Sequence, residues 1–364
     1  MSLHLKGEFF LYKIQFFPRE KISTIKSVAI SLASILLALM VSGIIFILTD
    51  VDPILAYYNL FRSFTNLALL SESVVRAIPI MLVALGLALA YKANFISVGG
   101  EGQIYFGGII ATSLVLWNIQ NNIIPEPLFM PITLIVVFLC SSLWGIIPAL
   151  LKARFEVNEV LTTLMMNYIA QIISNYLVIG PWKDPKGHGF PQSQAFPQYA
   201  RFPLIPNTTI NSSIFIGLFA ALIIYFILSK TKFGFEVKVV GDSYPTAKYA
   251  GISYTKVVCT VMAISAGLSG LAGLSIVGGV IGRLRPDFSP GYGYTGIIVA
   301  WLCNLNPIII IFGSIFFGGL LVGGEVLQSS MGLSVGVTDV FQALMLIFTL
   351  SGEFFKRYRI VWRR

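Results

Sequence analysis

The chain has 364 residues, of which 56% are hydrophobic and only 11% charged. A soluble domain carries charge on about a quarter of its residues, so this composition excludes a soluble protein and predicts an all-α polytopic membrane protein. The formal net charge is +9, from 25 Lys and Arg against 16 Asp and Glu. We attribute this excess to membrane topology and to attraction between basic residues and inner-leaflet lipid, and we predict no nucleic-acid partner.

Apolar stretches long enough to cross a bilayer predict about ten transmembrane helices. In chain order they cover 27–48, 74–91, 103–117, 128–151, 160–179, 214–228, 257–281, 294–303, 307–326 and 336–350. The third, eighth, ninth and tenth spans are short or rich in glycine, so the boundaries of the third and eighth stay open. Within the seventh span, Gly267, Gly270 and Gly273 predict a small helix face for close packing.

An even number of spans places both termini on one side of the membrane, and most Lys and Arg residues then fall on segments of that side. The positive-inside rule identifies this side as the cytoplasm. The predicted organisation is a basic cytoplasmic arm at 1–26, a transmembrane domain at 27–350 and a basic cytoplasmic tail at 351–364. Within the transmembrane domain, 181–211 is expected to be an outer loop and 229–256 a cytoplasmic loop.

The cytoplasmic loop at 229–256 contains the signals of one very short helix. Pro245 suits the first helical position, Tyr244 before it is biased away from the helical region, and Gly251 supplies a left-handed stop. Isolated helices shorter than ~12 residues rarely persist in water, so another surface must hold this one. That surface is either a separate cytoplasmic protein or the chain's own membrane domain, and spacing alone does not separate the two interpretations.

Two sequence strings occur twice in the chain. Val157–Met166, which opens the fifth span, is similar to Val337–Leu346, which opens the tenth. Phe95–Gln103, before the third span, is similar to Phe288–Tyr294, before the eighth. Because five spans separate the copies, they cross the membrane in opposite directions. This arrangement predicts inverted repeats formed by spans 2–5 and 7–10.

Inverted repeats place a substrate path where their halves meet, and glycine-broken helices expose backbone groups only where they line a cavity. The glycine-rich strings place Glu101 and Gln103 in one such break and Tyr292 and Tyr294 in the other. A carboxylate within the bilayer is costly, so Glu101 is a candidate functional residue. The alternative is a structural role, in which Glu101 caps a helix N-terminus or pairs with a neighbouring helix.

The sequence carries no signature of catalysis. A phosphate-binding G-x-x-x-x-G-K-[ST] loop, a nucleophile elbow and a zinc signature are all absent, and the three cysteines lie in predicted spans without metal-ligand spacing. Gly291–Gly296 fits the dinucleotide pattern G-x-G-x-x-G, but the βαβ unit that this pattern requires is not predicted around it. We therefore expect no enzyme, no cofactor and no metal site.

Four strings together resemble the motifs of one family. Ile96–Gln103 resembles N-I-G-x-E-G-Q, with Ser97 where the family usually has Asn, and Val157–Ala170 resembles V-N-E-V-x-x-T-L-M-x-N-Y-I-A. Ser289–Ile297 resembles S-P-G-Y-G-F-T-G-I, and Phe233–Ile252 is similar to the family's coupling loop. The chain thus resembles the permease subunits of ABC importers for nucleosides and simple sugars, in the branched-chain amino acid and ribose permease superfamily. The resemblance covers nearly the whole chain apart from the N-terminal arm.

This resemblance implies a multi-pass permease in the plasma (inner) membrane of a prokaryote, which forms the translocation path for nucleosides. A simple sugar is the alternative substrate. Three partners are implied: a cytoplasmic ATP-binding subunit, a second permease subunit and an extracytoplasmic substrate-binding protein. The resemblance favours a heterodimer of two unlike permeases, and a homodimer is the alternative. In such importers the short cytoplasmic helix docks on the ATP-binding subunit, and the loop at 181–211 resembles that of the longer of two permease types.

Two groups of residues are expected to carry this function. The substrate path would involve Glu101, Gln103, Asn167, Tyr292 and Tyr294. The coupling helix would involve Asp242, Tyr244, Pro245, Ala247, Lys248, Ala250 and Gly251, with Tyr244, Ala247 and Ala250 on its contact side. The glutamate and glutamine would hydrogen-bond ribose or base, and the two path tyrosines would stack on a base. A rival from another class is a proton-coupled secondary transporter that uses Glu101, Glu325 or Asp339 and needs no ATPase.

Overall fold

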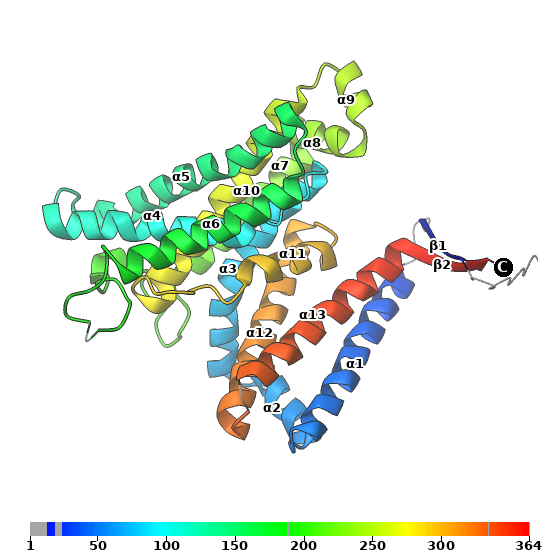
Figure 1. Cartoon of the computed structure of the whole chain (residues 1–364), viewed down its shortest axis with the longest axis horizontal. Coiled ribbons are helices and arrows are strands. Elements are labelled where there is room, and N and C mark those ends of the chain that lie inside the picture. The colour runs from blue at the N-terminus through cyan, green and yellow to red at the C-terminus, as the bar shows by residue number, and fades with distance from the viewer. Residues whose placement is uncertain (1–12, 19–23, 188, 334, 364) are drawn as a thin grey trace, which may run out of the picture. The chain divides into compact units, whose positions relative to one another are not determined.

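The computed structural model describes residues 13–18, 24–187, 189–333 and 335–363, and most of these residues are helical (Figure 1). The chain forms two compact units, which are described separately. The smaller unit combines Met1–Pro53 with Asp339–Arg364, and the larger unit is Ile54–Thr338.

The smaller unit joins a helix from each end of the chain. These are α1 (Thr24–Leu48) and α13 (Val335–Arg357), most of which belongs to this unit. The rings of Phe46 and Phe341 stack with centroids 5.9 Å apart. At Gly352 of α13 an added Cβ would collide with the side chain of Ser34 in α1, so the two helices pack closely.

Beyond these helices the two ends of the described chain pair as strands. β1 (Lys13–Pro18) and β2 (Tyr358–Arg363) are antiparallel, with Lys13 opposite Arg363 and Pro18 opposite Tyr358. From the sequence, these segments were expected only as parts of a basic arm and a basic tail. A short strand whose partner lies at the other end of the chain leaves no signal in a search for apolar spans.

Two mutually packed helices form the core of the larger unit. They are α3 (Leu67–Lys92) and α10 (Tyr254–Ile276), the most buried of the long apolar helices in the described chain. The helices that cover them are α4 (Gly100–Asn121) and α5 (Glu126–Phe155) on α10, and α11 (Tyr292–Leu302) and α12 (Pro307–Met331) on α3. The same arrangement therefore occurs twice. In each case, a helix that starts in a glycine-rich string packs on a central helix, and so does the helix that follows it.

Glycines allow the backbones of this core to touch. An added Cβ on Gly107 of α4 would collide with the backbone of Gly270 in α10, and one on Gly273 would collide with the carbonyl of Ile104. At Gly267 an added Cβ would come within 2.5 Å of the Phe138 ring. The small helix face predicted in the seventh span is thus confirmed, because each of its glycines lies at a close helix contact.

The other elements of the larger unit surround this core. They are α2 (Pro53–Thr65), α6 (Glu159–Ile179), η1 (Gln198–Ala200), α7 (Ser213–Lys230), α8 (Lys232–Asp242), α9 (Tyr244–Tyr249) and η2 (Val277–Ile281). The element η2 is a π-helical turn that directly continues α10.

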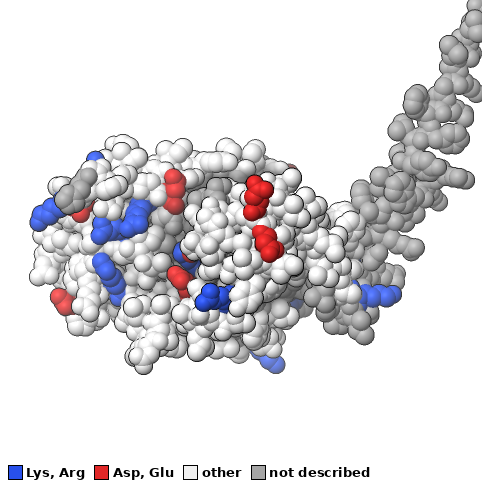
Figure 2. Space-filling view, turned by 90° about the horizontal axis from the view of Figure 1, so that it is seen from below, with Lys and Arg blue, Asp and Glu red and all other residues white. Residues whose placement is uncertain are grey.

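Helices lie at all ten ranges that the sequence predicts as spans. Within the described ranges, six helical segments are long and apolar enough to cross a membrane, namely α3, α4, α5, α7, α10 with η2, and α12. The helix α2 was not predicted, because its 13 residues are too few for a span and include Arg62. Charged side chains are sparse on the face drawn in Figure 2, as expected of a membrane protein.

Candidate functional site

The two glycine-rich strings that the sequence pairs do meet, at the N-termini of α4 and α11. The backbone N–H of Gly293 donates to Oε2 of Glu101 at 2.7 Å, and the Glu101 side chain is buried, with 6% of the residue exposed. An added Cβ on Gly293 would collide with the backbone of Glu101. Glu101 therefore caps the α11 N-terminus, where an unpaired N–H group and the helix dipole both favour a carboxylate.

Side chains of α6 hold the bent segment that precedes α4. Oδ1 of Asn167 accepts from the backbone N–H of Gly102 at 2.8 Å, and its Nδ2 donates to the carbonyl of Val98 at 2.9 Å. The hydroxyl of Thr163 accepts from the N–H of Val98 at 3.1 Å. Asn167 is buried, and both ends of its side-chain amide form hydrogen bonds with backbone groups, so it fixes the shape of this segment. Gln103 is buried as well, and its Oε1 has no hydrogen-bond partner among the described residues.

Tyr292 faces the protein interior, with only 3% of the residue exposed. Its hydroxyl accepts from Nη1 of Arg76 at 3.1 Å. Nη2 of Arg76 pairs with Oε1 of Glu325 at 2.9 Å. The start of α11 is therefore tied to α3 and α12 by one arginine, in addition to its cap from α4.

Tyr294 lies at the surface, with 38% of the residue exposed, and its side chain is close to Asn167. Nearby on α6, Tyr168 is exposed and polar residues follow at helical spacing. Nε2 of Gln171 and Nδ2 of Asn175 donate to the same oxygen of Asp287, at 2.9 and 3.3 Å. We call this set the α6 strip: Tyr168, Gln171, Asn175, Asp287 and Tyr294.

Sequence reasoning missed four of the five residues of the α6 strip. A signal was present, because Asn167, Gln171 and Asn175 recur every four residues in a predicted span and so lie on one side of a helix. Asp287 carried no comparable signal, since it lies in a connection between helices.

The short helix predicted at Tyr244 to Gly251 is present as α9, which has six residues. Its N-cap is Ser243, whose Oγ accepts from the N–H of Thr246 at 3.4 Å, and Gly251 has the predicted left-handed backbone with a φ of 71°. The exposed candidates are Asp242, Tyr244, Pro245, Lys248, Ala250 and Gly251.

At two residues of α9, the exposure of the side chain differs from what the expected docking surface implied. Ala247, which was expected on the contact side, is 1% exposed and seats α9 on its own chain. Tyr249 was not singled out from the sequence, yet it is 95% exposed. A large aromatic ring that makes so little contact with its own protein is typical of an interface residue.

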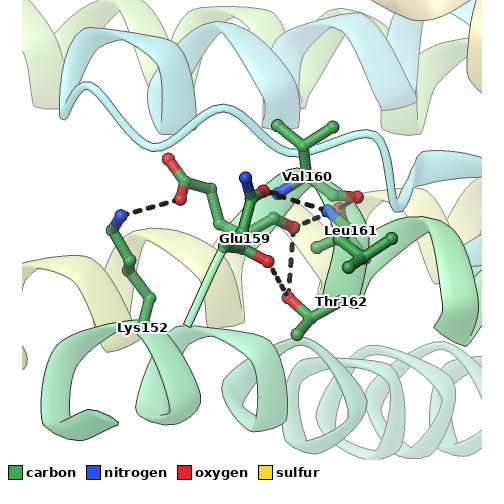
Figure 3. Close-up of polar contacts among 7 residues, drawn as sticks. Lys152, Glu159, Val160, Leu161 and Thr162 are labelled. Atoms are coloured by element: carbon green, nitrogen blue, oxygen red, sulfur yellow. Dashed lines mark hydrogen bonds and ion pairs between the residues drawn. The ribbon is translucent and has the colours of Figure 1, made fainter. Parts of the chain in front are cut away.

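A series of aromatic and charged contacts connects α9 with the start of α6. The ring of Tyr244 meets that of Tyr254, the first residue of α10, edge to face with centroids 5.3 Å apart. Tyr254 lies close enough to interact electrostatically with Lys152 and Glu159. Figure 3 shows this charged pair, in which Nζ of Lys152 lies 2.8 Å from Oε2 of Glu159, at the turn from α5 into α6. The side chain of Asn158 caps α6 at the same turn.

The chain is similar to permeases of known transport systems. Residues 69–350 match the family described as the permease component of branched-chain amino acid transport systems. The glucose ABC transporter permease TsgB13 of Haloferax volcanii is 31% identical over 360 residues, covering 96% of this chain and 93% of that protein. The guanosine ABC transporter permease NupP of Bacillus subtilis is 30% identical over 331 residues (88% and 92%), and the nucleoside ABC transporter permease NupB of Lactococcus lactis is 28% identical over 333 residues (89% and 90%).

The chain therefore belongs to the family of branched-chain amino acid transport system permease components. It is a multi-pass membrane protein and the permease component of an ABC transporter, which is not itself catalytic. The family resemblance drawn from the sequence motifs is confirmed.

Proposed function

We propose that this permease imports a nucleoside along the α6 strip, as one half of an ATP-driven importer. The relatives support either a sugar or a nucleoside, since TsgB13 is a glucose permease and NupP a guanosine permease. The observation that favours a nucleoside is the pair of exposed tyrosines on the strip, Tyr168 and Tyr294. Exposed aromatic rings provide stacking surfaces for a planar base, whereas a sugar has less need of them.

A second permease completes the path. Polar side chains on a membrane-crossing helix are rarely exposed to lipid and mostly face a protein partner or a water-filled cavity. The α6 strip, with Gln171, Asn175 and Asp287, has this character. We assign the opposite wall of the substrate path to an unlike permease chain. Glu101, Gln103, Asn167 and Tyr292 form the buried layer that supports the path, and Tyr294 faces the substrate.

The inverted repeat and the topology are part of this proposal. The packing of α4 and α5 on α10 has its counterpart in the packing of α11 and α12 on α3, as expected for two related halves. The pairing of β1 with β2 brings both ends of the described chain together, which fits an even number of spans. The basic residues place these ends in the cytoplasm, with 1–26 and 351–364 as cytoplasmic segments and 27–350 as the permease domain.

ATP hydrolysis on a partner subunit drives the cycle. A binding protein delivers substrate to the outer loop at 181–211, and the ATP-binding subunits close on α9 within the cytoplasmic loop at 229–256. The contact of Tyr244 with Tyr254 and the ion pair of Lys152 with Glu159 then carry the displacement to the start of α6. The plasma membrane of a prokaryote is the location that this assembly requires.

Replacing Tyr294 with alanine is expected to weaken nucleoside transport selectively. Stacking on one aromatic ring contributes roughly 1–3 kcal/mol, so the guanosine concentration for half-maximal uptake should rise roughly tenfold. Tyr294→Phe keeps the ring and should transport nearly as well as the unaltered chain. Initial rates of guanosine and glucose uptake in vesicles that hold the complete transporter measure this effect. The matched control is Tyr225→Ala, on an exposed position of α7. Equal rates in the Tyr294→Ala and unaltered transporters would refute the stacking role.

Replacing Tyr249 with alanine is expected to release the ATP-binding subunit. Truncation of a central interface tyrosine commonly costs about 2 kcal/mol or more, which corresponds to a loss of affinity of at least roughly tenfold. The measurement is the amount of ATP-binding subunit retained by the affinity-purified permease at a series of subunit concentrations. Tyr58→Ala, on an exposed position of α2, is the control and should retain the subunit normally. Unchanged retention by Tyr249→Ala would remove α9 from the proposed interface.

A further inference from the structure

A cavity outside the α6 strip lies between α3, the outer loop and η2. Its volume is about 400 Å³, within the range of small-molecule sites. The polar side chains around it come from Glu72, Arg76, Arg201, Thr208 and Thr209. We propose that this cavity, the outer vestibule, receives the hydroxyl-bearing ring of the substrate before it reaches the α6 strip. The proposal rests on the proposed function and adds a second site to it.

One wall of the vestibule holds an arginine in a defined position. Nε of Arg201 donates to the carbonyl of Phe196 at 2.8 Å, which anchors its guanidinium. The guanidinium lies over Gly282, where an added Cβ would be 2.9 Å from Cζ of Arg201. Gly282 has a φ of 71°, so glycine meets two demands there, a left-handed backbone and room for the arginine.

The outer loop is seated on the π-helical turn in the same wall. The N–H of Phe202 donates to the carbonyl of Gly278 in η2 at 3.0 Å. An added Cβ on Gly279 would come within 2.7 Å of the Asn211 side chain, so loop and turn fit closely. Single π-helical turns within α-helices frequently mark functional sites, and this one gives the vestibule a backbone wall.

The opposite wall links the vestibule to the α6 strip. Arg76 lines the cavity and also binds the hydroxyl of Tyr292, the first residue of α11. Tyr294 lies two residues further along α11 and belongs to the strip. The two sites therefore flank one short stretch of α11, with Tyr292 directed to the vestibule side and Tyr294 to the strip.

The chemistry of the lining favours a neutral polyol. Arginine side chains only donate hydrogen bonds, the carboxylate of Glu72 only accepts them, and threonine hydroxyls do both. A sugar hydroxyl can satisfy each of these groups, because it also donates and accepts. The exposed side chain of Leu204 supplies apolar surface for the ring carbons. The ligand is thus a ribose within a nucleoside or a free hexose.

Protection of an introduced cysteine tests this site. Thr209→Cys is labelled with a charged methanethiosulfonate reagent in vesicles that hold the complete transporter without binding protein or ATP. Guanosine, glucose and guanine are the added probes. A ligand at about ten times its Kd leaves roughly a tenth of its sites free, so labelling should slow roughly tenfold with guanosine or glucose and stay unchanged with guanine. Whichever of guanosine and glucose protects at the lower concentration is the compound whose ring occupies the vestibule.

Controls separate this inference from the proposed function. Ala195→Cys, exposed on the same outer loop but outside the cavity, should label at one rate with every probe. Adding Glu72→Gln to Thr209→Cys should raise the protecting concentration severalfold, and Leu204→Cys replaces Thr209→Cys if the latter does not assemble. Equal labelling rates with and without guanosine or glucose would overturn the proposal. Protection by guanine equal to that by guanosine would overturn it as well. ATP-driven uptake by the unaltered transporter, measured in the same vesicles, reports separately on the proposed function.

Discussion

Gly293→Ala is expected to lower uptake strongly and to destabilise the permease. An added Cβ would collide with the backbone N and Cα of Glu101 and with the carbonyl carbon of Gly100. These are backbone atoms of a helix start, so they cannot rotate aside as a flexible side chain would. Overpacking of a tight core costs about 1–3 kcal/mol or more, which lowers the functional population roughly tenfold or further. Uptake rate per molecule and melting temperature in detergent measure both consequences.

Gly180→Ala is the matched control for this substitution. Gly180 is exposed just beyond the end of α6, and an added Cβ there would meet only the carbonyl of Tyr176, at 3.0 Å. Only one neighbouring atom would have to shift there, so uptake and melting temperature should fall far less than with Gly293→Ala. If Gly293→Ala behaved like this control, the N-termini of α4 and α11 would not be in contact, and the arrangement of the path would be incorrect.

Glu101→Ala and Glu101→Gln are expected to give opposite results. Alanine leaves the buried N–H of Gly293 without its acceptor, at a cost of roughly 1–3 kcal/mol, and uptake should fall roughly tenfold. Glutamine keeps a side-chain oxygen for the same hydrogen bond, so Glu101→Gln should retain most of the uptake. Initial rates at several external pH values provide the measurement.

This pair of variants also separates the two classes of transporter. A proton-coupled carrier that used Glu101 would be inactivated by glutamine, because an amide cannot release and bind the proton. An ATP-driven permease in which Glu101 caps α11 would tolerate it. Loss of uptake in Glu101→Gln at every pH, with normal stability, would therefore count against the capping role and favour the rival.

The sequence predicted where the helices lie better than which way their side chains face. Apolar windows and glycine-rich strings located the helices and correctly paired the segments at the starts of α4 and α11. Tyr292 and Tyr294 were assigned one role. Residues two positions apart in an α-helix, however, lie about 200° apart around the helix axis. One of them is consequently buried against Arg76 and the other exposed at the α6 strip. Burial of this kind depends on packing partners distant in the sequence.

The same limit applies to α9 and to the vestibule. Proline and glycine signals located α9, but its orientation comes from contacts with the rest of the chain, so Ala247 could not be recognised as buried or Tyr249 as exposed. Arg76 and Arg201 are far apart in the sequence, and the cavity that they line exists only once the loop at 181–211 is seated on η2.

Reconstitution of accumulation against a gradient tests the central claim most directly. The permease is placed in sealed vesicles alone, or with its partner permease, the ATP-binding subunit and the substrate-binding protein, and guanosine and glucose inside the vesicles are measured with and without ATP. We predict accumulation only for the complete assembly supplied with ATP, and none for the permease alone under any pH gradient. Accumulation driven by a pH gradient in vesicles that contain this chain alone would contradict the account.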